Sequence, residues 1–156
     1  MDDKAIQAMA DAIASKFKKN MTLERARSLS EAVRQKAAEM GVNAVVAVSD
    51  SAGKPVLVEC MDNSYIASYD VAVNKAFTVV ALKMSTADLK PLAQPNGSLY
   101  GIQFTNGGKI VIFGGGEFLT NGTGDIVGGL GVSGGTEEQD SKLALYGKQI
   151  FEKGRI

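Results

Sequence analysis

Two short apolar runs joined by a polar turn restrict the fold of this chain more than any other feature. Residues 42–48 are rich in β-branched side chains, and residues 55–61 form a second run of the same kind. Residues 49–54, Ser-Asp-Ser-Ala-Gly-Lys, have turn chemistry between them. The pattern predicts a β-hairpin, and strands joined by hairpins form antiparallel sheets.

Apolar side chains recur at helical spacing on both sides of this hairpin. The spacing predicts helices over residues 3–18 and 22–40, a third that Ser64 or Ser68 could cap and that reaches about Lys83, and a last one over 136–153. Thr22 is predicted to cap the second helix and Gly41 to end it. Thr136 and Gln139 match a capping box at the start of the last helix.

Three further strands are predicted after the third helix, over residues 99–104, 109–114 and 126–132. Asn106-Gly107 indicates a tight hairpin, and residues 121–125 indicate a looser turn. The order of elements is two helices, a hairpin, a helix, three strands and a helix. It predicts one α+β domain, with an antiparallel sheet of about five strands and helices on its faces.

The composition excludes several classes of function. The chain of 156 residues has no histidine and a single cysteine, Cys60. One chain therefore cannot form a serine–histidine or cysteine–histidine pair, a His-ligated zinc site, a proximal-His heme or an internal disulfide. Seventeen basic residues balance seventeen acidic ones, so we expect neither nucleic-acid nor membrane binding. The acidic N-terminus does not resemble a secretory signal, and we expect a cytoplasmic protein.

Two glycine-rich turns are candidate binding elements. Residues 129–134, Gly-Leu-Gly-Val-Ser-Gly, match a dinucleotide-binding pattern, but the second parallel strand of a Rossmann unit does not follow. A weaker possibility is an anionic group at the helix start beside Gly134, Gly135 and Thr136, and the alternative is a tight turn without ligand. Residues 114–116, three successive glycines, permit close approach of a flat ligand, or simply form a bulge or bend.

Polar residues in apolar surroundings are the other candidates. Asp62 follows the second strand of the hairpin, as turn chemistry or as part of a site. Cys60 is expected to be an inert buried thiol, because no cation lies near it in sequence. Lys75 interrupts the most apolar helix, and either extends to solvent, the default expectation, or is buried beside an acid or a ligand carboxylate.

Five motifs in order resemble the GlcG/HbpS-like family, and most resemble the C-terminal domain of propanediol-utilisation corrinoid adenosyltransferases. They are Met61-Asp62 and residues 68–76, 99–103, 110–116 and 131–140. The resemblance implies a profilin-like fold, a five-stranded antiparallel sheet in a three-layer α/β/α arrangement. It covers residues from about 22 to 146, which divides the chain into an N-terminal amphipathic helix, residues 1–20, and a GlcG/HbpS-like domain, residues 21–156.

The resemblance also implies functions. Members of the family form oligomers, several bind heme or iron, and some belong to bacterial microcompartments. The adenosyltransferase activity belongs to a separate helical domain that this chain lacks. The family commonly has Arg where this chain has Cys60, and some heme-binding relatives use a histidine. Heme would here be held by Met61, Met84, Tyr or Thr, or by packing alone.

We therefore predict a homo-oligomeric module that binds a small ligand, heme or a corrinoid-type tetrapyrrole, with flavin as a further candidate, in diol or glycerol metabolism. Residues 1–20 would pack on the protein itself or dock on microcompartment proteins. The alternatives are an enzyme that uses Asp62 and Lys75 on a small anionic metabolite, and an assembly protein without a ligand. The predicted ligand-binding residues, expected to converge in one cavity or subunit junction, are Met61, Asp62, Lys75, Gly114, Gly115, Gly116, Gly134 and Gly135.

Overall fold

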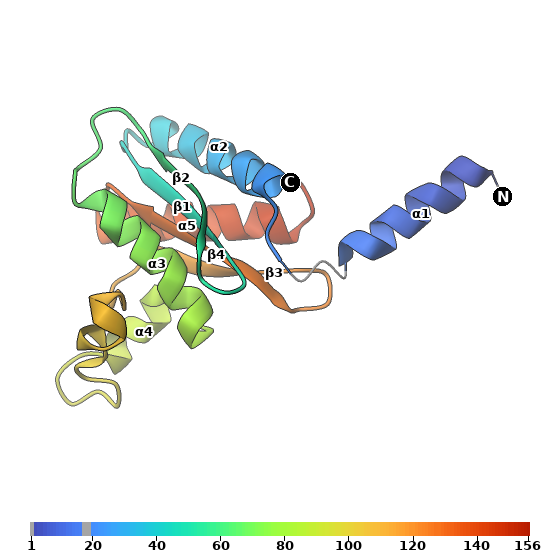
Figure 1. Cartoon of the computed structure of the whole chain (residues 1–156). Helices are drawn as coiled ribbons and strands as arrows, with labels where there is room; N and C mark the ends of the chain where they lie inside the picture. The colour runs from blue at the N-terminus through green and yellow to red at the C-terminus, as the bar shows by residue number, and fades with distance from the viewer. Residues whose placement is uncertain (1, 17–19) are drawn as a thin grey trace.

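A computed structural model describes residues 2–16 and 20–156 of the chain (Figure 1). Its helices are α1 (Asp3–Lys16), α2 (Leu23–Glu39), α3 (Ser68–Leu82), α4 (Thr86–Leu92) and α5 (Glu137–Glu152), and its strands are β1 (Val45–Asp50), β2 (Pro55–Cys60), β3 (Gly116–Thr120) and β4 (Ile126–Ser133). Two short 3₁₀ turns, Ile102–Phe104 and Asn106–Gly108, lie between α4 and β3. Among the described residues, no helix is long and apolar enough to cross a membrane.

The strands form one antiparallel sheet in the order β2-β1-β4-β3. The predicted hairpin is confirmed, because β1 pairs with β2 across the turn at residues 51–54. The looser turn at residues 121–125 joins β3 to β4, which makes the second hairpin.

The prediction of five strands is wrong, since the sheet of the described residues has four. Residues 99–104 form turns and a 3₁₀ segment, where Gly101 has a positive φ of 90° and Phe104 is 83% exposed. Residues 109–114 lie beside α3 without joining the ladder, and the Val111 N–H donates to the Thr78 hydroxyl at 3.0 Å. The apolar composition of these two segments therefore predicted strands wrongly, because their backbone groups bond within turns or to side chains.

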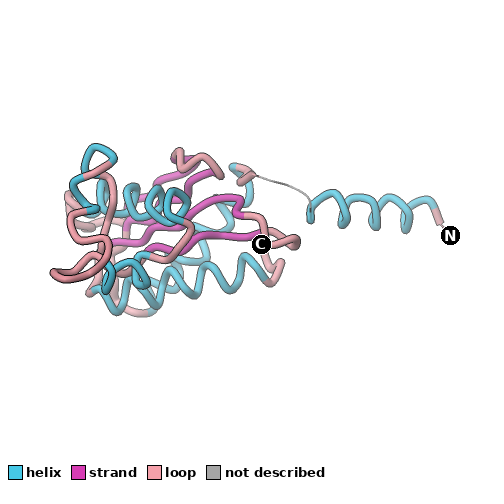
Figure 2. Tube along the Cα trace, turned by 90° about the horizontal axis from the view of Figure 1, so that it is seen from below, coloured by secondary structure: helices cyan, strands magenta, loops and turns pink. Residues whose placement is uncertain are grey.

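Helices cover both faces of the sheet, which gives the expected three layers (Figure 2). The larger core lies between the sheet and helices α2 and α5, and it includes Leu29, Val46, Leu130 and Leu143. On the opposite face α3 packs on β1 and β4. Two predicted helix starts are confirmed, with Thr22 as the cap of α2 and a complete capping box at Thr136 and Gln139. Helix α3 instead begins at Ser68 after Ala67, without a side-chain cap.

A glycine in β4 allows α3 to lie close to the sheet. A Cβ on Gly131 would clash with the backbone of Ala72 and Ala76 in α3. The backbone of the helix therefore contacts the backbone of the strand almost directly, in a way that no other residue type permits.

Helix α1 stands apart from the sheet and its covering helices in both views (Figures 1 and 2). Ile6, Met9 and Ile13 share one face of this helix and are each about half exposed, at 49%, 56% and 53%. The predicted end of the helix, at residues 17 and 18, lies outside the described residues.

Candidate functional site

Most of the predicted site residues lie at one end of the sheet. The antiparallel order brings together the start of β1, the end of β2, the end of β4 and the start of β3. In the register, Val45 is opposite both Cys60 and Ser133, and Gly131 is opposite Gly116. Segments 60–63, 114–116 and 133–135, far apart in sequence, therefore meet at this end.

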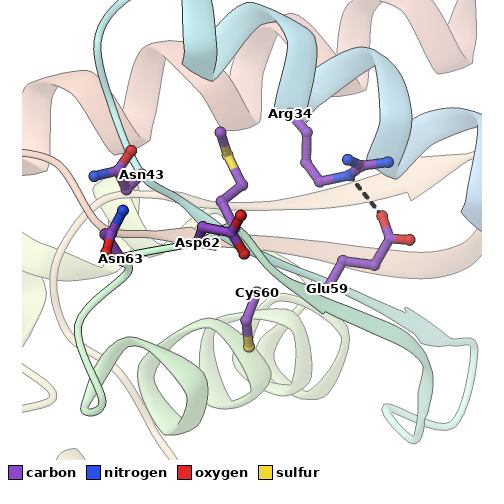
Figure 3. A pocket seen from close by; sticks show the side chains of 7 residues that line it. Arg34, Asn43, Glu59, Cys60, Asp62 and Asn63 are labelled. Atoms are coloured by element: carbon purple, nitrogen blue, oxygen red, sulfur yellow. Dashed lines mark hydrogen bonds and ion pairs between the residues drawn. The ribbon is translucent and has the colours of Figure 1, made fainter.

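The first hollow at this end, which we call the β2-end pocket, has a volume of about 590 Å³. Its lining residues are Arg34, Asn43, Glu59, Cys60, Met61, Asp62 and Asn63 (Figure 3). Glu59 accepts hydrogen bonds from the Arg34 guanidinium, at 2.7 Å from Nε, and from the Ser30 hydroxyl at 2.5 Å. This network holds Arg34 over the strand and pairs its positive charge with the carboxylate of Glu59. Arg34 is therefore not available to balance the negative charge of Asp62.

The two residues of the Met61-Asp62 motif have different surroundings. The Met61 sulfur accepts a hydrogen bond from the Ala44 N–H at 3.3 Å and packs against the larger core. Asp62 is exposed, and in Figure 3 its carboxylate lies between the Asn43 and Asn63 amides on one side and Arg34 and Glu59 on the other. Among the described residues, Asp62 makes no ion pair.

Cys60 does not have the buried position that its sequence context predicted. Its side chain is exposed, and in Figure 3 the sulfur points toward α3, away from Asp62. The alternation of β2 explains the direction, because Glu59 and Met61 face α2 while Cys60 faces the opposite side of the sheet. Cys60 lies on the edge strand, where that side is open.

The second hollow, the α3–α5 pocket, has a volume of about 350 Å³ and lies between the start of α3 and the turn that leads into α5. Its apolar walls come from Tyr65, Val71 and Phe113, and Gly134 and Gly135 line it without side chains. Tyr65 is 72% exposed and Phe113 40% exposed. The lining also includes the polar side chains of Ser68, Ser133, Glu137 and Asp140. Aromatic walls combined with a limited set of polar groups are typical of small-molecule sites, whose volumes begin at roughly 300 Å³.

Lys75 is buried beneath this pocket, and the default expectation that it reaches solvent is wrong. Its side chain has no exposed surface, and Nζ lies 2.7 Å from the Val132 carbonyl oxygen and 3.3 Å from Oδ2 of Asp140. The Phe113 ring centroid is 5.0 Å from the same nitrogen. Burial lowers the pKa of Lys75, opposed by the attraction of Asp140, and burial raises the pKa of Asp140, opposed by Lys75.

The glycine run Gly114–Gly116 packs against this lysine. A Cβ on Gly115, where φ is 114°, would lie 2.5 Å from the Lys75 ammonium and 2.8 Å from the Val132 oxygen. The neighbouring amides are already bonded, since the Gly114 N–H donates to Glu137 and the Gly116 N–H to Thr86, both at 2.9 Å. The run thus allows close approach of the chain's own side chains.

The start of α5 is also satisfied within the chain. The Gly135 N–H donates to Asp140 and the Thr136 N–H to Gln139, both at 2.9 Å. Glu137, Glu138 and Asp140 supply negative charge to the first turn. An anionic ligand would therefore meet carboxylates and occupied donors, which makes this helix start a poor anion site.

A third, smaller hollow of about 190 Å³ connects the two pockets. It shares Asn43 and Asn63 with the β2-end pocket, and Tyr65, Gly134 and Gly135 with the α3–α5 pocket. The structure thus places Met61, Asp62 and the Gly134-Gly135 turn along one continuous surface, while Lys75 and Gly115 lie beneath it.

The residues at this end suit a flat, apolar cofactor better than a bare metal ion. Among the described residues, no group of three or more Cys, Asp or Glu side chains is placed to hold a metal. Tyr65 offers a phenol oxygen at the mouth of the α3–α5 pocket, and tyrosine is a known heme ligand. Met61, by contrast, has its sulfur engaged by Ala44.

Sequence reasoning did not single out Arg34, Asp140, Tyr65 or Phe113. Asp140 could have been sought, because a lysine in an apolar helix requires an acidic partner if it is buried. Phe113 lies within the family motif at residues 110–116 but was given no role there, and Arg34 and Tyr65 carry no sequence pattern that distinguishes them from ordinary surface residues.

The fold and the motifs at this end of the sheet are those of one protein family. A family model described as "Haem degrading protein HbpS-like" matches residues 21–149, and the chain belongs to this HbpS-like family.

Individual relatives agree with this assignment. The chain is 43% identical over 134 residues to an "Uncharacterized 15.0 kDa protein in dhaT-dhaS intergenic region" of Citrobacter freundii, covering 85% of this chain and 93% of the relative. It is 35% identical over 147 residues to the "Corrinoid adenosyltransferase PduO" of Citrobacter freundii, covering 89% of this chain and 44% of the relative. The chain thus spans less than half of that enzyme.

A solved structure described as a "PduOC:Heme Complex" superposes with a TM-score of 0.79 at 34% identity, covering 83% of this chain and 94% of that one. This relative contains heme, as its description states.

Proposed function

We propose that this protein is a tetrapyrrole-binding module, with heme as the first candidate ligand and a corrinoid as the second. The α3–α5 pocket is the observation that carries the proposal, since its apolar aromatic wall remains exposed in the folded chain. Phe113 and Tyr65 would contact the ring faces, and the Gly134-Gly135 turn would let a flat ring approach the backbone. The heme complex of the PduOC relative supports the same ligand class.

Tyr65 is the proposed axial ligand. It combines a pocket-facing position with high exposure, whereas the Met61 sulfur and the Lys75 ammonium already have partners within the chain. Lys75 would act by holding the pocket floor in place through Asp140 and Val132. The enzyme hypothesis has less support, because a buried and bonded Lys75 is not available to a substrate at Asp62.

Hemin titration of the purified protein tests this proposal, followed by absorbance and by electron paramagnetic resonance. We expect saturable binding with a high-spin ferric signal, because a phenolate is a weaker-field ligand than a pair of imidazoles. Tyr65→Phe should change the spectrum, and Phe113→Ala should lower the affinity about tenfold, the effect of losing one aromatic contact. Tyr100→Phe is the matched control, since Tyr100 is 65% exposed and lies outside both pockets.

Hemin that binds no better than to an unrelated protein would remove heme from the proposal. Thermal-shift measurements with cobalamin and flavins would then identify any other ligand, because a ligand specific for the folded state raises the melting temperature. Saturable hemin binding unaffected by the Tyr65 and Phe113 variants would instead refute the assignment to this pocket.

The biological setting is proposed from the resemblance and from the names of the relatives. We place the module in the cytoplasm, as a homo-oligomer that serves diol or glycerol metabolism, either free or within a microcompartment. The N-terminal segment, residues 1–20, would dock on other proteins of that compartment through the exposed Ile6, Met9 and Ile13 of α1. Deleting it should abolish co-purification with such a compartment and leave hemin binding unchanged.

A further inference from the structure

The two edges of the sheet differ in whether their outward backbone groups are satisfied. At the outer edge of β3, side chains of neighbouring helices close the strand. The Gly116 N–H donates to the Thr86 hydroxyl at 2.9 Å, Lys148 donates to the Phe118 oxygen at 2.6 Å, and the Thr120 N–H donates to Glu152 at 3.2 Å. Such capping protects an edge strand from pairing with another chain.

The outer edge of β2 has no such protection. The Met61 N–H donates to the Ala44 oxygen at 3.0 Å, so the N–H of Met61 points toward β1. By antiparallel alternation from Met61, Cys60 and Val58 point their N–H and C=O groups outward. The register with β1 shifts by one residue between Leu57 and Pro55, which leaves Val56 without a partner in β1. Across residues 2–16 and 20–156, no side chain bonds to these outward groups.

The sequence of β2, Pro-Val-Leu-Val-Glu-Cys, also favours pairing. It is mostly apolar and contains one charged residue, Glu59, whose carboxylate is bonded to Arg34 and Ser30. An unpaired strand with this composition is a template for a second strand.

We propose that β2 pairs antiparallel with β2 of a second copy of this chain, about a two-fold axis at Val58. The two sheets then form one continuous sheet across the subunits. This pairing specifies an interface for the proposed homo-oligomer and does not depend on the ligand.

Charge and hydrogen bonding select this register. With Val58 opposite Val58 of the second copy, Val56 faces Cys60 of the second copy, and the outward N–H and C=O groups of Val58 pair with those of the second copy's Val58. Lys54 precedes β2 and Asp62 follows it, so this register brings the Lys54 side chain to the end of the interface where the second copy's Asp62 lies, twice by symmetry. Both residues are exposed, and neither makes an ion pair among the described residues.

The neighbouring registers are less favourable. An axis at Glu59 would place the two Glu59 carboxylates directly opposite each other, which is repulsive. An axis at Leu57 would place Cys60 opposite Lys54, which lies outside β2, and would separate Lys54 from Asp62. The chosen register also brings a lysine to each β2-end pocket, where Asp62 has no cationic partner among the described residues.

Cysteine cross-linking tests both the interface and the register. Hydrogen-bonded residues opposite each other have Cα atoms about 5.5 Å apart, within the range for a disulfide. Val58→Cys in a Cys60→Ser background should therefore give a covalent dimer under mild oxidation. The wild type is the matched control, because its two Cys60 residues would lie about four residues apart along the strands, about 13 Å, and should not cross-link.

Charge reversal provides the second test and requires no change in the strand itself. Lys54→Glu and Asp62→Lys should each weaken dimerisation, measured by sedimentation equilibrium, by roughly tenfold, because two pairs turn from attractive to repulsive. The double variant should restore the wild-type affinity. A monomer at micromolar concentration, a dimer that the Val58→Cys substitution does not cross-link, or a cross-link through Cys60 would each overturn the proposal. Hemin binding is scored separately, so either proposal can fail alone.

Discussion

The buried Lys75–Asp140 pair gives the sharpest test of how this fold is held together. Lys75 is fully buried, its ammonium bonds to Val132 and Asp140, and the pair connects α3 to β4 and α5. Removing one member of such a pair leaves an uncompensated buried charge, which costs about 3–5 kcal/mol. We expect Lys75→Met and Asp140→Asn each to lower the free energy of unfolding by this amount at pH 7.

The double variant Lys75→Met, Asp140→Asn should be less destabilised than the sum of the two single variants. Neither charge remains to be desolvated, and Met fills the volume of the lysine stem. We expect a coupling free energy of about 2 kcal/mol, within the range for residues in direct contact. Urea unfolding followed by far-ultraviolet circular dichroism measures it, since the chain has no tryptophan for fluorescence.

The pH dependence of Asp140→Asn provides an independent check. Burial already lowers the pKa of Lys75, and removing Asp140 removes the attraction that opposes this effect. The unfolded state then binds more protons than the folded state between the lowered pKa and the ordinary value, about 10.4. In that window the stability of Asp140→Asn should rise with pH. Single-variant effects that add within about 0.5 kcal/mol, or a deficit that does not change between about pH 7 and 10, would refute the reasoning.

Two further predictions concern local structure. Thr136→Ala should cost about 1 kcal/mol in unfolding free energy, because it removes the oxygen that accepts the Gln139 N–H at 3.2 Å; an unchanged urea midpoint would contradict the capping role. Gly131→Ala should cost about 1–3 kcal/mol, because its Cβ would press on the backbone of Ala72 in α3; a variant as stable as the wild type would show that α3 can move away freely.

The local elements of this protein could be predicted from its sequence where the determining interactions lie within a few residues. The cap at Thr22, the capping box at Thr136 and the hairpin turn at residues 51–54 depend on neighbours in the chain, and each is present in the structure. The five family motifs likewise predicted the family, because they occur in order over most of the chain.

The candidate site was predicted only in part. Met61, Asp62 and Gly134-Gly135 lie along one surface, but their role as ligand contacts stays a prediction. Tyr65 and Phe113 escaped sequence reasoning because their importance comes from exposure beside a hollow, which composition does not report.

Strand pairing and the burial of charged side chains depend on residues distant in sequence, so only the tertiary structure decided them. Residues 99–104 and 109–114 have apolar composition suited to strands, yet the sheet lacks them. Residues 99–104 bond within their own turns, the Val111 N–H bonds to Thr78 of α3, and β3 takes the place beside β4. Lys75 was expected in solvent, and only the approach of Asp140, 65 residues away, makes its burial possible. The sequence by itself determined the helices α2, α3 and α5 and the strands β1, β2 and β4, because their signals are local. Helix α4 and strand β3 were not among the predicted elements, and packing selected the strands that pair and the charges that are buried.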